Sequence, residues 1–243
     1  MKQIRMVEPG NRDQLIALFN LRSASDAILA YYALEHPFHR VKIFASYSES
    51  DQPTEFILLA QTGLDLFRSL LLPNVMAEET FGRLLHNALS PMQPILLYLP
   101  LDQRAWAERF LEISNSSVYE LLRLERNSFN PLFNVLVTPN RGADGFMRFE
   151  INAQSGAHAA AGINWQGKSF AEVYVEADQE SARRKFTVSV LSALCQYLLE
   201  RKLTPLMRYD ESFNIDYDSL DQMGFSSTGS RILLGQAIRK EDA

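Results

Sequence analysis

VYVEADQESARRKFTVSVLSALCQYLLER, residues 173–201, contains the sequence pattern that is most informative about the fold and the site of this chain. An apolar run leads into a polar turn, three consecutive cations and a long amphipathic stretch typical of a helix. Cations at a helix start oppose the positive end of the helix dipole, which costs up to roughly 1 kcal/mol each. The cations Arg183, Arg184 and Lys185 therefore predict that an anion joins them at this turn.

Two interpretations of the turn are open. In the first, the free backbone N–H groups of the helix start, the three cations and the hydroxyls of Ser181 and Thr187 bind a phosphate or diphosphate. In the second, the cations form a solvated first turn whose side chains bend back to Asp178 and Glu180.

Composition narrows the class of protein. The 243 residues are 47% apolar and 22% charged, as in an ordinary globular chain of one large or two small domains. A net charge of -5 argues against nucleic acid as a partner. The single cysteine excludes an internal disulfide and fits a reducing compartment. Because the N-terminus has no signal-peptide pattern and no apolar run reaches the roughly 20 residues of a membrane helix, we expect a cytoplasmic protein without membrane contact.

Element order suggests two related halves. In the first half, a helix over 77–89, a strand over 94–100 and a helix over 102–113 follow one another. In the second half, strands over 133–139 and 145–152 and a hairpin over 158–177 precede the helix over 181–202. A strand over 203–210, a helix over 216–224 that ends at Gly224, and a last strand over 226–238 complete the series. The boundary is expected at residue 130, which gives halves of 1–130 and 131–243.

The second half resembles the GNAT family, the Gcn5-related N-acyltransferases. Residues 171–194 resemble the family's fourth strand, phosphate-binding turn and following helix. Residues 203–225 resemble its fifth strand, its fourth helix and a leucine-glycine-phenylalanine ending, here Met223-Gly224-Phe225. The resemblance covers residues 146–237, and the first half is similar to a second, degenerate copy in element order. It implies an α/β (α+β) fold with a mixed, mostly antiparallel sheet, flanking helices and tandem GNAT-like halves.

The resemblance also implies an activity. The implied activity is that of an acyl-CoA-dependent N-acyltransferase, specifically an N-acetyltransferase. The implied co-substrate is acetyl-CoA, no metal is implied, and the implied acceptor is a small-molecule or peptide amine. The sequence leaves the oligomeric state open. The residues implied to hold the acyl-CoA are Val175, Glu176, Ala177, Arg183, Arg184, Lys185, Phe186, Thr187 and Val188.

The turn departs from the family's pattern, which normally contains glycine. On an alignment without gaps, the leading basic residue of the motif falls on Ala182, the glycine on Lys185 and the small residue on Thr187. Glycine lets the backbone approach a pyrophosphate and adopt positive φ without a Cβ clash. Two outcomes follow: a decayed site on a non-catalytic binding or regulatory protein, or cations that grip the phosphates directly.

Three side chains are candidates for catalysis by the same resemblance. Glu172 matches a general base on the fourth strand, and its alternative is a half-exposed strand glutamate. The family's acidic tyrosine falls on Leu220, so Tyr209 or Tyr217 would replace it; the alternative for both is packing between surface and core. Cys195 lies among leucines of the long helix, where a buried thiol is expected.

Overall fold

Two units make up the chain in the computed structural model, which describes residues 3–63, 65–154, 156–178, 185–212 and 215–241. Unit 1 comprises Met1–Tyr119 and Arg231–Ala243, and unit 2 comprises Glu120–Ser230. The units therefore divide the chain at two positions, whereas the sequence predicts one boundary at residue 130. Among the described residues, no helix is both long and apolar enough to cross a membrane.

The sheet of unit 1 has its parallel pair near the middle. Its strands follow the order β1-β2-β3-β4-β5-β12-β6, with the end of β12 between β5 and β6. β4 and β5 run parallel, and their neighbours β3 and β12 run antiparallel to them. The strands are β1 (Gln3–Met6), β2 (Val41–Tyr47), β3 (Pro53–Ala60), β4 (Leu70–Asn74), β5 (Pro94–Pro100), and parts of β6 (Leu111–Leu124) and β12 (Phe225–Arg239).

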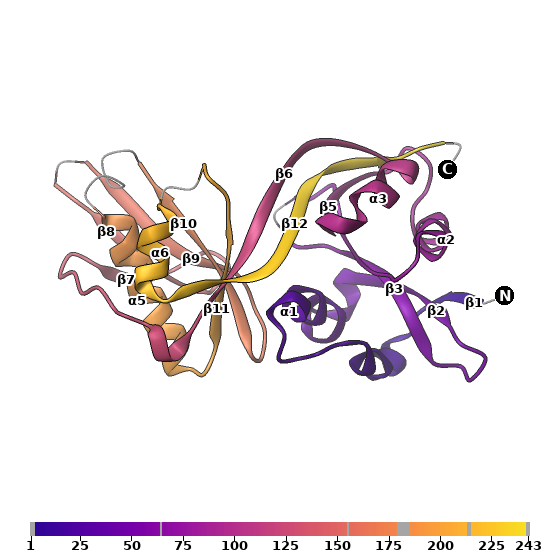
Figure 1. Cartoon of the computed structure of the whole chain (residues 1–243), viewed down its shortest axis with the longest axis horizontal. Helices are drawn as coiled ribbons and strands as arrows, with labels where there is room; N and C mark the ends of the chain where they lie inside the picture. Colours follow the sequence, from indigo (N-terminus) through magenta and orange to yellow (C-terminus); the bar gives the residue numbers. More distant parts are fainter. Residues whose placement is uncertain (1–2, 64, 155, 179–184, 213–214, 242–243) are drawn as a thin grey trace. The chain divides into compact units, whose positions relative to one another are not determined.

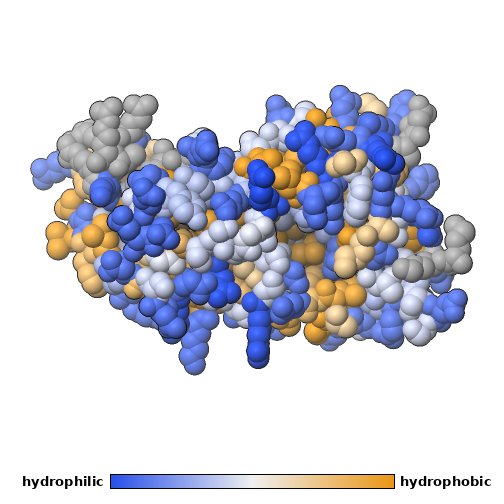
Figure 2. Space-filling view, in the orientation of Figure 1, coloured by the Kyte–Doolittle hydropathy of each residue, from blue (hydrophilic) through white to orange (hydrophobic). Residues whose placement is uncertain are grey.

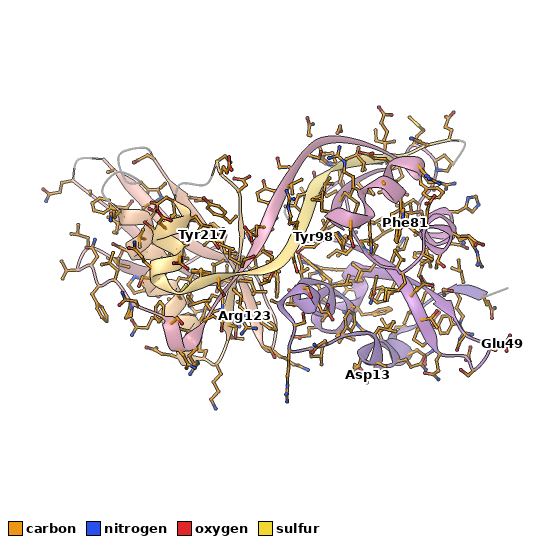
Figure 3. The ribbon with its side chains drawn as sticks, in the orientation of Figure 1. Asp13, Glu49, Phe81, Tyr98, Arg123 and Tyr217 are labelled. Carbon is orange, nitrogen blue, oxygen red and sulfur yellow. The ribbon has the colours of Figure 1, made fainter. Side chains whose placement is uncertain are left out.

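Helices of unit 1 lie between β1 and β2 and on either side of β5. The first group is η1 (Pro9–Leu18), α1 (Ala24–Ala30), η2 (Tyr31–Glu35) and η3 (Phe38–Arg40); the second is α2 (Glu78–Ala88), η4 (Leu101–Gln103) and α3 (Arg104–Phe110). α2 buries Phe81, Leu84 and Leu85 in one hydrophobic cluster with β3, β4 and β5. Figure 3 labels Phe81 at this cluster.

Unit 2 repeats the strand order of unit 1. The order is β7-β8-β9-β10-β11-β6-β12, and β10 and β11 form its parallel pair. Its strands are β7 (Thr138–Arg141), β8 (Met147–Asn152), β9 (His158–Gln166), β10 (Phe170–Ala177), β11 (Thr204–Tyr209) and the remaining parts of β6 and β12. A turn replaces the helices that join the first two strands of unit 1, because Gly142 N–H bonds directly back to the Phe146 carbonyl.

Two helices of unit 2 pack against each other and share the core (Figure 1). They are α5 (Phe186–Glu200) and α6 (Tyr217–Met223), and a short η5 (Arg126–Ser128) follows β6. The core includes Leu191, Leu194 and Cys195 of α5, Leu220 of α6, and inward residues of β9 and β10. Gly224 ends α6 with φ 104°, as the sequence predicts, and its missing Cβ would lie 2.7 Å from the Ser128 carbonyl oxygen.

The outer face of α5 is covered by chain rather than by water. The Leu132 amide donates to Ser192 Oγ at 2.7 Å, and Asn134 Nδ2 donates to Ser189 Oγ at 3.3 Å. The residues before β7 thus contact the helix, which explains how Ser189 and Ser192 are buried with satisfied hydroxyls. Phe133 and Val135 of this segment are exposed, and apolar side chains reach the surface of the unit in Figure 2.

Three expectations about elements need correction. Residues 133–137 form no strand, because the segment that contains them packs on α5 through side-chain hydrogen bonds and pairing begins only at Thr138. The helix expected over 102–113 ends at Phe110, where β6 begins. Finally, β12 is longer than expected, and its second half pairs with β5 of unit 1.

Candidate active site

The two parallel strands of unit 2 part halfway along their length. β10 and β11 pair at Phe170↔Thr204, Ala171↔Pro205 and Glu172↔Leu206, and no further. Beyond that point β10 stays paired with β9, and β11 with β6. Alternate backbone N–H and C=O groups of residues 173–177 therefore face a side that β11 has left, where an extended ligand can use them.

Val175, Glu176 and Ala177, which the resemblance implies for acyl-CoA binding, occupy the end of this parted strand. The Val175 side chain is buried in the core below α5, so only its backbone remains for a ligand. Glu176 is exposed and accepts a hydrogen bond from Arg148 Nη2 of β8 at 2.8 Å. The strand thus offers backbone groups on one edge and a paired carboxylate on one face.

The next described element in the chain after β10 is α5, which begins at Phe186. The first intrahelical bond runs from the Ser189 amide to the Lys185 carbonyl, so the amides of Phe186, Thr187 and Val188 lie ahead of it. The Phe186 and Thr187 side chains are buried, which leaves their backbone as the part that can meet a ligand. Arg183 and Arg184 lie outside the described residues.

Lys185 takes the conformation that a glycine would normally provide. Its φ is 56° and its ψ is 25°, in the left-handed region. This conformation costs a residue with a Cβ about 1–2 kcal/mol. The turn therefore keeps the left-handed backbone without the glycine, and it places an exposed ammonium group at the helix start.

Comparison with known proteins identifies the fold of the chain. No family model and no curated protein matches the sequence. Solved structures do match. A GNAT-family acetyltransferase from Colwellia psychrerythraea is 11% identical, with 96% of this chain and 99% of that chain covered and a TM-score of 0.59. A tandem GNAT protein from the clavulanic acid biosynthesis pathway is 9% identical, with 97% and 98% covered and a TM-score of 0.59. The chain has the GNAT fold.

A third structure agrees with this assignment. A GCN5-related N-acetyltransferase from Sphaerobacter thermophilus is 8% identical, with 98% of this chain and 96% of that chain covered and a TM-score of 0.60. The likeness to a tandem protein over almost the whole chain supports the two-half GNAT architecture. Identities this low show the fold, and the chemistry has to be argued from the side chains.

Glu172 of the GNAT fold's parted strand is buried and fully engaged. Its side chain is 2% exposed. Oε1 accepts from Asn164 Nδ2 at 2.7 Å and from Arg208 Nε at 2.9 Å, and Oε2 accepts from Trp165 Nε1 at 3.1 Å. The sequence revealed the carboxylate but not its partners. Asn164 and Trp165 lie on β9 and Arg208 on β11, and pairing them requires the strand register.

Tyr209 and Tyr217 lie together at the end of β11, as either candidate for the missing family tyrosine would require. Their rings make an edge-to-face contact with centroids 5.6 Å apart. Tyr217 projects from the first turn of α6 (Figure 3) and is 37% exposed. Burial raises the pKa of Tyr209, and the carboxylates of Asp216 and Glu211 raise it further. Tyr209 consequently keeps its proton, while Leu220 is buried in the core.

The equivalent region of unit 1 is crossed by hydrogen bonds of its own side chains. β4 and β5 pair only at Leu70↔Leu96 and Leu71↔Leu97. In the turn that follows, however, the Met76 amide donates to the buried Glu55 carboxylate at 2.8 Å. Gln103 Nε2, from η4 after β5, donates to the Val75 carbonyl at 3.0 Å. A carboxylate of the chain thus accepts from an amide of the turn that precedes α2.

Acidic residues also begin α2, with Glu78 and Glu79 in its first turn. Glu78 pairs with Arg109 at 2.6 Å. This negative charge complements the helix dipole without any ligand. Of the two GNAT-like units, unit 2 is the one whose helix start carries a cation.

Cys195 has no part in this site. It is buried in the core of unit 2, and burial raises the pKa of its thiol, so the reactive thiolate is disfavoured.

Proposed function

We propose that the chain is an acyl-CoA-dependent N-acyltransferase that moves an acetyl group from acetyl-CoA to an amine, with unit 2 as the active unit. One observation carries the proposal: β10 and β11 part after Glu172, and the next described helix in the chain, α5, begins with three amides that precede its first intrahelical hydrogen bond. The acetyltransferases that share the fold support the same class of reaction.

Bound acetyl-CoA would supply a thioester carbonyl at the parted strands. The freed backbone groups of residues 173–177 would hold the extended pantetheine arm by hydrogen bonds, as an added strand would be held. The amides of Phe186, Thr187 and Val188 and the ammonium of Lys185 would bind the diphosphate at the helix start. By sequence, Arg183 and Arg184 add two charges directly before Lys185.

The transfer itself asks little of the protein. The amine nitrogen attacks the thioester carbon and loses a proton to solvent as the amide bond forms. The carbon–sulfur bond breaks, and the leaving thiolate takes a proton. Tyr209 is the group we assign to that last step, because its raised pKa keeps the phenol protonated beside the end of β11. Tyr217, in contact with Tyr209, would hold its ring in place.

The acceptor is proposed to be a small-molecule or peptide amine in the cytoplasm. No side chain among the described residues identifies it further. The alternative is a GNAT-fold protein that binds a ligand without turning it over. It has one observation in its favour, the buried Leu220 at the position of the family's tyrosine.

Thermal unfolding with and without acetyl-CoA tests the proposal. A ligand at 100 times its Kd adds about 2.7 kcal/mol to the free energy of unfolding, which raises the melting temperature measurably. No shift with acetyl-, propionyl- or free CoA would overturn the proposal. A shift without thiol release against a panel of amines would favour the non-catalytic alternative.

A further inference from the structure

A single carboxylate lies at the point where the strands of unit 2 part. Glu172 and Leu206 form the last pair of the parallel register between β10 and β11. On its other side, β10 shifts register against β9 between Glu172 and Val173. Trp165 pairs with Glu172 and Ile163 with Val173, so Asn164 is an extra residue, a bulge in β9.

The Glu172 carboxylate ties all three strands at this point. It accepts from the bulge residue Asn164 and from Trp165 on β9, and from Arg208 on β11 through Nε at 2.9 Å and Nη2 at 2.5 Å. We call these four residues, Glu172, Arg208, Asn164 and Trp165, the strand clip. With both oxygens engaged and 2% of the side chain exposed, the carboxylate cannot take a proton from an incoming amine without breaking the clip.

The clip lies at the position where β11 leaves β10. Below it the strands pair as a regular sheet, and above it the backbone groups of 173–177 are free on the β11 side. A bulge bends its strand and increases the local twist, and the Asn164 amide fixes that bend through Glu172. Arg208 is followed at once by Tyr209, so the clip also anchors the strand that carries the proposed proton donor.

We propose that Glu172 is a positioning residue, not a general base: the strand clip fixes the point at which β10 and β11 part and thereby the depth to which a pantetheine arm enters between them. This proposal rests on the proposed function. The clip acts on the arm and the thioester, because its hydrogen bonds join β9, β10 and β11 at the parting point.

The experiment compares two ligands on Glu172→Gln, Arg208→Gln and the double variant. One ligand is acetyl-CoA. The other is 3′-phosphoadenosine 5′-diphosphate, which is coenzyme A without its pantetheine arm. Calorimetric titration measures both affinities, and steady-state kinetics over pH measures kcat. Glu125→Gln is the matched control, since it removes a carboxylate of the same unit that pairs with Arg123 outside the clip.

We expect each single clip variant to weaken acetyl-CoA binding by about tenfold or more, because a buried hydrogen-bonded charge loses its partner. The double variant should be no more than about threefold weaker than the singles, since the two residues act as one unit. Affinity for the arm-less nucleotide and for both ligands in Glu125→Gln should stay within about twofold of the wild type.

Three results would overturn the proposal. Unchanged acetyl-CoA affinity in Glu172→Gln, with kcat reduced and the acidic limb of its pH profile lost, would make Glu172 the base. An equal loss of affinity for both ligands would mean that the substitution disturbs the whole unit and that the clip does not act on the arm. If Glu172→Gln does not fold, Arg208→Lys is compared in its place, because lysine keeps the charge but not the forked contact. A wild type that binds neither ligand would overturn the proposed function itself, and the clip's role with it.

Discussion

Replacing Lys185 by glycine should stabilise the chain relative to replacing it by alanine. Lys185 has φ 56° and ψ 25° at the start of α5. Both variants remove the ammonium group, and only the alanine keeps a Cβ in the left-handed region. The comparison therefore isolates the backbone from the charge.

The magnitude follows from two opposing terms. A left-handed conformation costs a residue with a Cβ about 1–2 kcal/mol, which glycine avoids. Glycine also loses more conformational freedom on folding, which lowers the free energy of unfolding by about 0.5–1 kcal/mol. The free energy of unfolding of Lys185→Gly should thus exceed that of Lys185→Ala by up to about 1.5 kcal/mol, and each 1 kcal/mol corresponds to about 2–4 °C in melting temperature for a chain of this size.

Differential scanning calorimetry measures the stability difference, and titration with acetyl-CoA measures what the charge contributes. If the ammonium binds a phosphate, both variants should lose about tenfold in affinity, the value of one charge-assisted contact. A Lys185→Ala protein that melts at or above Lys185→Gly would refute the left-handed turn. Wild-type affinity in both would refute the phosphate contact.

Three further predictions concern charge, proton transfer and pH. Arg184→Glu, which by sequence stands just before Lys185, should weaken acetyl-CoA binding by about tenfold or more in titration with an unchanged melting temperature; equal affinity would leave the turn without a ligand role. Tyr209→Phe should lower kcat by about a hundredfold at an unchanged KM for acetyl-CoA, whereas Tyr217→Phe should lower it by less than tenfold; the reverse order would exchange their roles. His36 is buried, and burial lowers the pKa of its imidazole, with Arg40 and other cations nearby lowering it further. Its contribution to stability is thus present above the unfolded pKa of about 6.5 and lost as pH falls through the folded value, so the melting temperature should drop between pH 7.5 and 5 more steeply in the wild type than in His36→Phe; parallel curves would contradict this.

The sequence predicts the local elements of unit 2 well, since they follow from local signals. The apolar period of α5 and the glycine that ends α6 at Gly224 are written in neighbouring residues. The helix expected over 181–202 begins only at Phe186 among the described residues, because Lys185 ahead of it is left-handed, and this conformation falls on the residue aligned with the family's glycine.

Long-range pairing is what the sequence does not contain. The second half of β12 reaches β5, an exchange between the halves that no local pattern encodes. The same holds for Glu172, whose partners Arg208 and Trp165 lie on two other strands. A polar residue in a strand looks half-exposed until the register shows which donors surround it, and so its engaged carboxylate became visible only in the fold.

Likewise, Glu55 carries no signal that it would accept from the turn of unit 1. It lies in β3, far in sequence from the Met76 amide that it accepts from. Only the sheet of unit 1 brings the two groups within 2.8 Å.

Isothermal titration of the wild-type chain with acetyl-CoA tests the central claim most directly, that the parted strands and helix start of unit 2 form an acyl-CoA site while those of unit 1 do not. The account predicts saturable binding with one acetyl-CoA per chain. No binding, or two equivalent sites per chain, would contradict it.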